Sequence, residues 1–133
     1  MSVCALAADP FVGSWKTKDE APPAPSRTMQ IEPQPYGLKT TLRSKQSNGS
    51  MKERVYEQIL DGHDHPYTDP DADSISYRRV DSRHIECVMK SSGKPIGHCQ
   101  MEVSPGENEL TFQSETTVRS GKPYKVIVVY RRQ

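Results

Sequence analysis

The sequence predicts an all-β protein, a single up-and-down antiparallel β-barrel. The chain of 133 residues contains 11 prolines and 8 glycines, so it makes many turns. Helical periodicity is nearly absent, whereas short segments rich in β-formers recur at about ten-residue spacing. Several of these segments alternate apolar and polar residues, which is typical of strands that bury one face.

The expected strands are separated by groups of Pro, Gly, Asn and Ser such as SNGS, SSGK and RSGK, which are residues that tight connections require. Consecutive strands with short links form a meander, and closing it into a barrel removes exposed edges. The interior of a barrel of about eight strands is either just filled or holds one small ligand. The expected strands cover residues 12–17, 27–33, 37–45, 51–60, 73–80, 83–90, 95–103, 108–118 and 123–132.

Alternation assigns the faces of these strands. Ile85, Cys87 and Met89 share one face, and His84 and Glu86 take the other. The last strand, 126–129, reads VIVV and is apolar on both faces. We therefore expect it to be central and well covered, or to form an interface such as that of a homodimer.

Charge and hydropathy argue against a nucleic-acid interface and against a membrane span. The 18 basic and 17 acidic residues are spread along the chain without a basic stripe, so no nucleic-acid interface is expected. No apolar run approaches the roughly 20 residues of a membrane span.

The first eight residues, MSVCALAA, contain the small-residue pattern Ala5-Leu6-Ala7 of a signal-peptidase site. Residues 1–8 are predicted to be the remnant of a signal peptide, or else a disordered N-terminus, and residues 9–133 the barrel domain. The first interpretation places the protein in the periplasm or outside the cell and removes Cys4.

Gly13-Ser14-Trp15 stands on the first strand of the predicted meander, and Tyr130-Arg131-Arg132 ends the last strand. These two ends resemble the calycin superfamily. In calycins a G-x-W tryptophan and an arginine of the last strand pack across the closed end of the barrel. The resemblance implies that Trp15 with Arg131 and Arg132 closes this barrel, by guanidinium stacking on the indole.

Five short phrases are spread over nearly the whole chain after residue 8: PFVGSWK (10–16), DG (61–62) leading to Pro66, DAD (71–73), RVD (79–81) and GKP (121–123). With these phrases the chain also resembles the small secreted bacterial lipocalin-like proteins. This resemblance implies a lipocalin-like or fatty-acid-binding-protein-like barrel and defines function poorly. Members of that group tend to carry Lys, Tyr and Gly where this chain has His63, His65 and Asp69, and cysteines are not part of their pattern.

The segment DGHDHPYTDPDAD (61–73) concentrates histidine and aspartate. His63 and His65 could share a metal ion on a strand, but the flanking Asp-Gly and Pro indicate a turn. We predict a loop at one rim of the barrel, with His63 and His65 as rim residues and no metal site.

Cys87 and Cys99 lie in successive strands, nearly opposite each other on the presumed inner face. Two states are open: a cross-strand disulfide, which an oxidising compartment would permit, or two reduced buried thiols.

Alternation also brings polar residues to the inner face. An inward Arg54 or Arg79 would imply an anionic partner, and the alternative is that these arginines extend to the rim. The predicted ligand-binding residues are Arg54, Tyr56, Gln58, Tyr77, Arg79, Met101, Phe112 and Tyr130.

The expected function is binding of a small, mostly hydrophobic or amphipathic molecule in the barrel lumen, without a cofactor. The alternative is a cofactor-independent enzyme of the isomerase, cyclase or lyase type in the same pocket. A third possibility is a solid interior and a function carried by the surface.

Overall fold

The computed structural model describes residues 9–18, 27–46, 48–68, 71–117, 121 and 123–133. The predicted signal-peptide remnant at 1–8 lies outside the described residues. Within them no helix is long and apolar enough to cross a membrane. The strands are β1 (Gly13–Thr17), β2 (Arg27–Gln34), β3 (Gly37–Lys45), β4 (Met51–Ile59), β5 (His65–Pro66), β6 (Ser74–Asp81), β7 (His84–Ser91), β8 (Lys94–Val103), β9 (Glu109–Thr117) and β10 (Pro123–Arg132).

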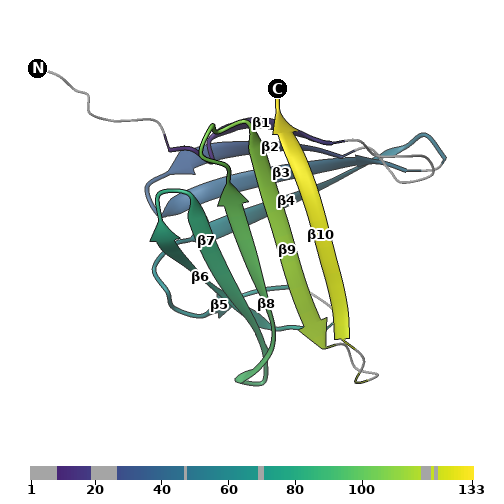
Figure 1. Ribbon diagram of the computed structural model, residues 1–133. Coiled ribbons are helices and arrows are strands. Elements are labelled where there is room, and N and C mark those ends of the chain that lie inside the picture. Colours follow the sequence, from purple (N-terminus) through teal and green to yellow (C-terminus); the bar gives the residue numbers. More distant parts are fainter. Residues whose placement is uncertain (1–8, 19–26, 47, 69–70, 118–120, 122) are drawn as a thin grey trace, which may run out of the picture.

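All ten strands belong to one antiparallel sheet, ordered β4-β3-β2-β1-β10-β9-β8-β7-β6-β5. Except for β4 and β5, strands that are consecutive in the sequence are neighbours in the sheet. The first strand pairs with the last, and the meander curls round into a barrel (Figure 1). The barrel is nearly closed, because β4 and β5 are the two ends of the hydrogen-bonded order. The predicted fold class is therefore confirmed.

The predicted strands match the observed ones closely, with one omission. The two-residue strand β5 lies inside the segment predicted to be only a loop, and its His65 pairs with Ile75 of β6. The sequence around β5 has the composition of a turn, which concealed this short pairing.

The closed end of the barrel holds its most deeply buried side chains. Phe11 and Trp15 are fully buried, and the Trp15 indole N–H donates to the Phe11 carbonyl at 3.1 Å. Bulky side chains of β3, β7 and β9 complete this packed layer: Leu38, Ile85 and Leu110.

Arg132 covers Trp15. Its guanidinium carbon lies 4.2 Å from the centre of the indole, and the same group donates to the carbonyls of Val12 (2.9 Å) and Pro10 (2.7 Å). A Cβ atom on Gly13 would come within 2.5 Å of the Arg132 Nη1 atom, so glycine is required for this close approach. One arginine thus ties the N-terminal segment to the last strand.

Arg131, which the resemblance grouped with Arg132, has no part in this closure. Arg131 is exposed, whereas Arg132 pairs in register with Trp15 and shares the inner face of β10 with Tyr130. Because successive residues of a strand point to opposite faces, only one of two adjacent arginines can reach the indole.

The apolar run on β10 also has two different environments. Tyr130 is buried on the inner face, and Val128 packs against the core. Ile127 on the outer face is 56% exposed, so the described residues leave this side of β10 uncovered.

Replacing Arg132 with Gln should lower the free energy of unfolding by about 2 kcal/mol or more, because the cation–π contact is lost and the accepting carbonyls lose their partner. The matched variant Arg131→Gln should change it by less than about 0.5 kcal/mol. Urea denaturation of both variants measures the difference, and equal effects would contradict the assignment of closure to Arg132.

Candidate ligand-binding cavity

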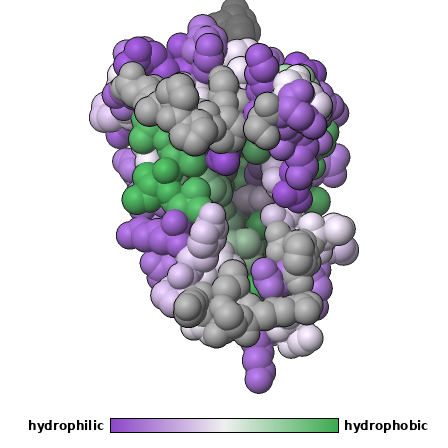
Figure 2. Space-filling model, turned by 90° about the vertical axis from the view of Figure 1, so that its right-hand side faces the viewer, coloured by the Kyte–Doolittle hydropathy of each residue, from purple (hydrophilic) through white to green (hydrophobic). Residues whose placement is uncertain are grey.

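The barrel surrounds a central cavity of about 470 Å³. Alternation on the strands turns one side chain in two toward this space. Figure 2 shows the surface hollowed near the middle of the face that it presents, with hydrophobic side chains beside the hollow. The apolar part of the cavity lining comprises Met29, Leu42, Ile75, Met89, Met101, Leu110 and Phe112.

A polar cluster interrupts the apolar lining. Gln58 of β4 is only 4% exposed, and its Oε1 atom accepts a hydrogen bond of 2.9 Å from Thr40 Oγ1. The Gln58 side chain also hydrogen-bonds to Tyr77, and Tyr56 and Tyr67 lie close by. We call Thr40, Tyr56, Gln58, Tyr67 and Tyr77 the tyrosine–glutamine cluster.

The phenol of Tyr77 is held in its neutral form. Burial raises its pKa far above the usual value for tyrosine, and the neighbouring Tyr67 and Tyr56 raise it further. A buried, neutral hydroxyl can donate a hydrogen bond to a ligand, but it is a poor proton acceptor.

Six of the eight predicted ligand-binding residues line the central cavity. They come from β4, β6, β8, β9 and β10, and all have the inward parity that alternation assigns. They are Tyr56, Gln58, Tyr77, Met101, Phe112 and Tyr130.

The two predicted arginines lie elsewhere. Arg79 is at the closed end, where it pairs with Asp9, donates to the Ser82 carbonyl at 3.2 Å and lies 5.5 Å from the centre of the Phe11 ring. It therefore holds the N-terminal segment and does not line the cavity. Arg54 is exposed on β4 and borders a second space.

This second space is a gap in the barrel wall with a volume of about 490 Å³. It lies between β4 on one side and β5 and β6 on the other, where the hydrogen-bonded order of the sheet ends. The gap directly adjoins the central cavity, because both are lined by Tyr56, Tyr67, Ile75 and Tyr77.

Of the two histidines predicted to be rim residues, His65 lies on the short strand β5, and His63 lies in the turn that precedes it. His65 borders the gap, and its Nε2 atom lies 2.9 Å from Asp61 Oδ2. The backbone N–H of His63 donates to Asp61 Oδ1, and this bond is the main cause of the lowered pKa of Asp61. Asp61 thus organises a turn, and the described residues contain no group of three or more His, Cys, Asp or Glu side chains suited to a metal ion.

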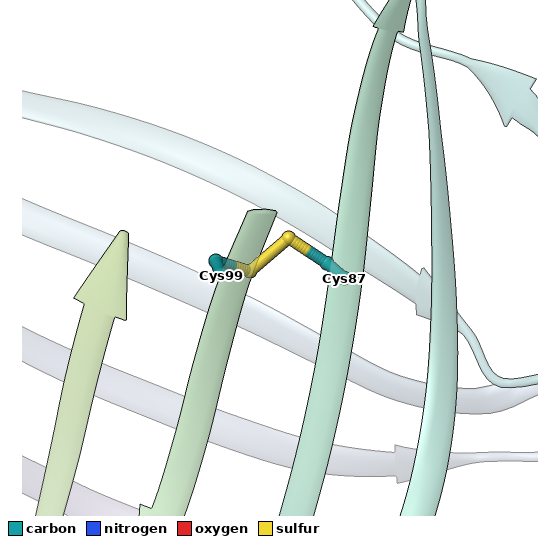
Figure 3. The surroundings of a disulfide bond; sticks show 2 residues. All are labelled: Cys87 and Cys99. Carbon is teal, nitrogen blue, oxygen red and sulfur yellow. A yellow bond between two sulfur atoms is a disulfide. The ribbon is translucent and has the colours of Figure 1, made fainter. Parts of the chain in front are cut away.

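Cys87 and Cys99 form a disulfide in the wall of the cavity (Figure 3). They are directly opposite in the register of β7 and β8, with a Cα–Cα separation of 4.9 Å. Of the two states left open by the sequence, the structure contains the bridged one.

Sequence reasoning missed the contribution of the loop after β5. Tyr67 and Ala72 line the cavity, and Ala72 is 5% exposed. Loop residues have no period-2 pattern, so nothing in the sequence could have assigned them to the interior. Thr40 was also missed, although its parity on β3 is inward like that of Leu42.

Neither known protein families nor curated proteins match this sequence. Solved structures do match. The fluorescent protein UnaG aligns with a TM-score of 0.59 and 18% identity, covering 92% of this chain and 97% of that one. Zebrafish ileal bile acid-binding protein, in complex with cholic acid, gives a TM-score of 0.55 and 12% identity, with 93% and 99% covered.

The chain shares its fold, a nearly closed antiparallel β-barrel, with these two proteins. Both neighbours align with this chain over almost its whole length, so the barrel architecture implied by the resemblance drawn from Trp15 and the last strand is supported at the level of the fold. At these identities the similarity concerns the fold alone. The bacterial and secreted parts of that resemblance stay predictions.

Alkaline titration should reveal the buried phenol. Because the folded-state pKa of Tyr77 is raised, the hydroxyl should stay protonated in the folded protein from pH 10 to 11, where an exposed tyrosine ionises. Tyr77→Phe should therefore leave the rise in absorbance at ~295 nm unchanged over this interval in the folded protein and reduce it in the urea-unfolded protein. A reduction of the same size in the folded and the unfolded protein would show that the Tyr77 hydroxyl is accessible.

The same shift predicts a sign for stability. Tyr77 ionises near pH 10 only in the unfolded chain. Its neutral form therefore contributes fully to the free energy of unfolding below that pH, and this contribution is lost as the pH rises above it.

Proposed function

We propose that this protein binds a small, mostly hydrophobic molecule in the central cavity. The observation that supports this most directly is the cavity itself. Its volume of about 470 Å³ falls within the range of about 300–1,000 Å³ that is usual for ligand pockets, and its lining is predominantly apolar.

The tyrosine–glutamine cluster suggests one polar group on this ligand. A polar group buried without a partner is costly, so a ligand oxygen or nitrogen that meets Tyr77 and Gln58 would be favoured over a wholly apolar molecule. The phenol is neutral, so this contact suits an uncharged acceptor such as a carbonyl, ether or hydroxyl oxygen.

The zebrafish neighbour is a bile acid-binding protein solved with cholic acid, and this supports a small-molecule ligand for the present barrel. The two chains share only 12% identity, so the lining residues have to define the ligand.

Binding is favoured over the enzyme alternative by the chemistry of the lining. General acid–base catalysis needs a group whose pKa lies near the working pH. Among the described residues, the only carboxylate that lines the central cavity is Asp71, no histidine lines it, and the raised pKa makes Tyr77 a poor base. A cavity of this size also argues against a function that uses only the outer surface.

A carboxylate placed in the apolar lining tests the proposal. Leu42→Asp should weaken the binding of a neutral apolar dye such as Nile red about tenfold or more, because an ionised group then faces the ligand. Thr41→Asp adds the same charge to the outer face of β3 and should bind the dye as the wild type does. Fluorescence titration gives both dissociation constants, and circular dichroism establishes that both variants are folded.

Equal dye binding by the wild type and Leu42→Asp would contradict the proposal, as would a wild type that binds no dye. Equal weakening by both variants would show that the dye binds somewhere other than the lumen.

A further inference from the structure

The wall of the central cavity is rich in sulfur. Among the methionines and cysteines that the structure describes, all but the exposed Met51 line this cavity. An apolar wall can be built from aliphatic side chains alone, whereas thiol and thioether sulfur can also bind a soft metal ion. The sulfur-bearing residues of the lining are Met29, Cys87, Met89, Cys99 and Met101.

Most of these sulfur atoms belong to one patch on β7 and β8. Cys87 and Cys99 are opposite each other in the register (Figure 3), and Met89 and Met101 each follow one of them by two residues. Each methionine is therefore the diagonal neighbour of the cysteine on the other strand, at a distance of about 7–8 Å that long side chains can span. We call Cys87, Met89, Cys99 and Met101 the sulfur cluster.

The sulfur cluster lies inside the barrel. Cys87 is 2% exposed and Met101 is 5% exposed, and Met89 packs against the buried core. The cavity of about 470 Å³ in front of the cluster adjoins the gap between β4 and β6, because several residues line both spaces. An ion or a small molecule that enters through the gap can therefore reach the cluster.

The ligand types in the cavity wall favour one metal. Thiolate and thioether groups are soft ligands that select Cu(I), whereas Zn²⁺ takes thiolate, imidazole and carboxylate groups. Among the described residues no histidine lines the cavity, and its one carboxylate is Asp71. Thioether sulfur thus outnumbers the harder ligands around the two cysteines.

Hydroxyl side chains flank the cysteines in the same row across the sheet. Tyr77 of β6 pairs in register with Cys87, and Ser114 of β9 pairs with Cys99. Both residues line the cavity. A hydroxyl group can donate a hydrogen bond to a thiolate, which lowers the cost of holding this charge inside the barrel.

We propose that the sulfur cluster binds one Cu(I) ion when its disulfide is reduced, with the two cysteine thiolates and the two methionine thioethers as ligands. The disulfide closes the site, because a thiolate is the form of cysteine that ligates a metal. This inference goes beyond the proposed function and does not depend on it.

A small dithiol is the reductant that opens the site. It transfers two electrons and two protons to the bridge, so that the S–S bond breaks, two thiols form and the dithiol becomes a disulfide. When Cu(I) binds, each thiol releases its proton to the solvent and becomes a thiolate ligand. Copper stays in the same oxidation state throughout.

Competition with bicinchoninate, a chelator that is coloured when it holds Cu(I), tests the site. Every protein in the test carries Cys4→Ser, so that the third cysteine of the chain cannot bind copper. The protein is reduced with dithiothreitol, separated from the reductant without air and titrated into the coloured complex. The reduced protein should remove the colour with one equivalent of Cu(I) bound, and the oxidised protein should leave the colour unchanged.

The methionines are tested without disturbing the cysteines. Met89→Leu combined with Met101→Leu keeps the apolar volume and removes both thioethers, so it should weaken Cu(I) binding about tenfold or more. Met51→Leu is the matched control, because Met51 is 61% exposed and lines neither the cavity nor the gap, and it should bind Cu(I) as the parent does. Circular dichroism establishes that these variants are folded.

X-ray absorption at the copper edge of the loaded, reduced protein should show sulfur ligands only. Equal removal of the colour by the oxidised and the reduced protein would overturn the proposal, as would no removal by the reduced protein. Parent affinity in the methionine double variant would show that the thioethers are not ligands. Equal weakening by Met51→Leu, or nitrogen and oxygen ligands in the spectrum, would show that copper binds elsewhere.

Discussion

The pairing of β1 with β10 is the constraint on which the rest of the structure depends. It joins strands β1–β4 and strands β5–β10 into one ten-stranded sheet, which curls into a barrel with an inner and an outer face. Arg132 reinforces the junction, because one side chain stacks on Trp15 and donates to backbone carbonyls of the N-terminal segment. Arg79 adds a second tie between that segment and the wall through Asp9. Both arginines therefore belong to the scaffold, whereas Arg54 borders the gap in the wall.

The distribution of side-chain sizes along the barrel axis explains why a cavity exists at all. Rings and branched aliphatic side chains such as Trp15 and Leu38 fill the closed end, and these residues are fully buried. Further along, smaller or unbranched side chains such as Thr40, Ser114 and Met89 face inward and leave space between the walls. A barrel with this number of strands has an interior that side chains can just fill. The choice of inward residues therefore decides between a solid core and a lumen.

Much of this arrangement follows from the alternation of side chains between the two faces of each strand. Strand alternation was enough to place Gln58, Tyr77 and Phe112 in the cavity wall, because a strand residue of the right parity must face inward. Parity gives the face of a strand but not the height along the barrel, which is why Arg54 and Arg79 were grouped with the lining. The loop after β5 has no period, so Tyr67 and the wall position of His65 could not be predicted. The gap itself depends on hydrogen bonds that β4 and β6 do not make, and no sequence pattern encodes that absence.

The methionines of the barrel report directly on whether its interior receives the ligand, which is the central claim. Met29, Met89 and Met101 line the cavity, whereas Met51 is 61% exposed and lines neither the cavity nor the gap. Two-dimensional ¹H–¹³C NMR of methionine methyl groups, recorded during a titration with 1-dodecanol, compares them within one molecule. We expect the resonances of the three cavity methionines to shift and saturate together while that of Met51 stays in place. Unchanged cavity resonances, or a shift confined to Met51, would contradict the claim.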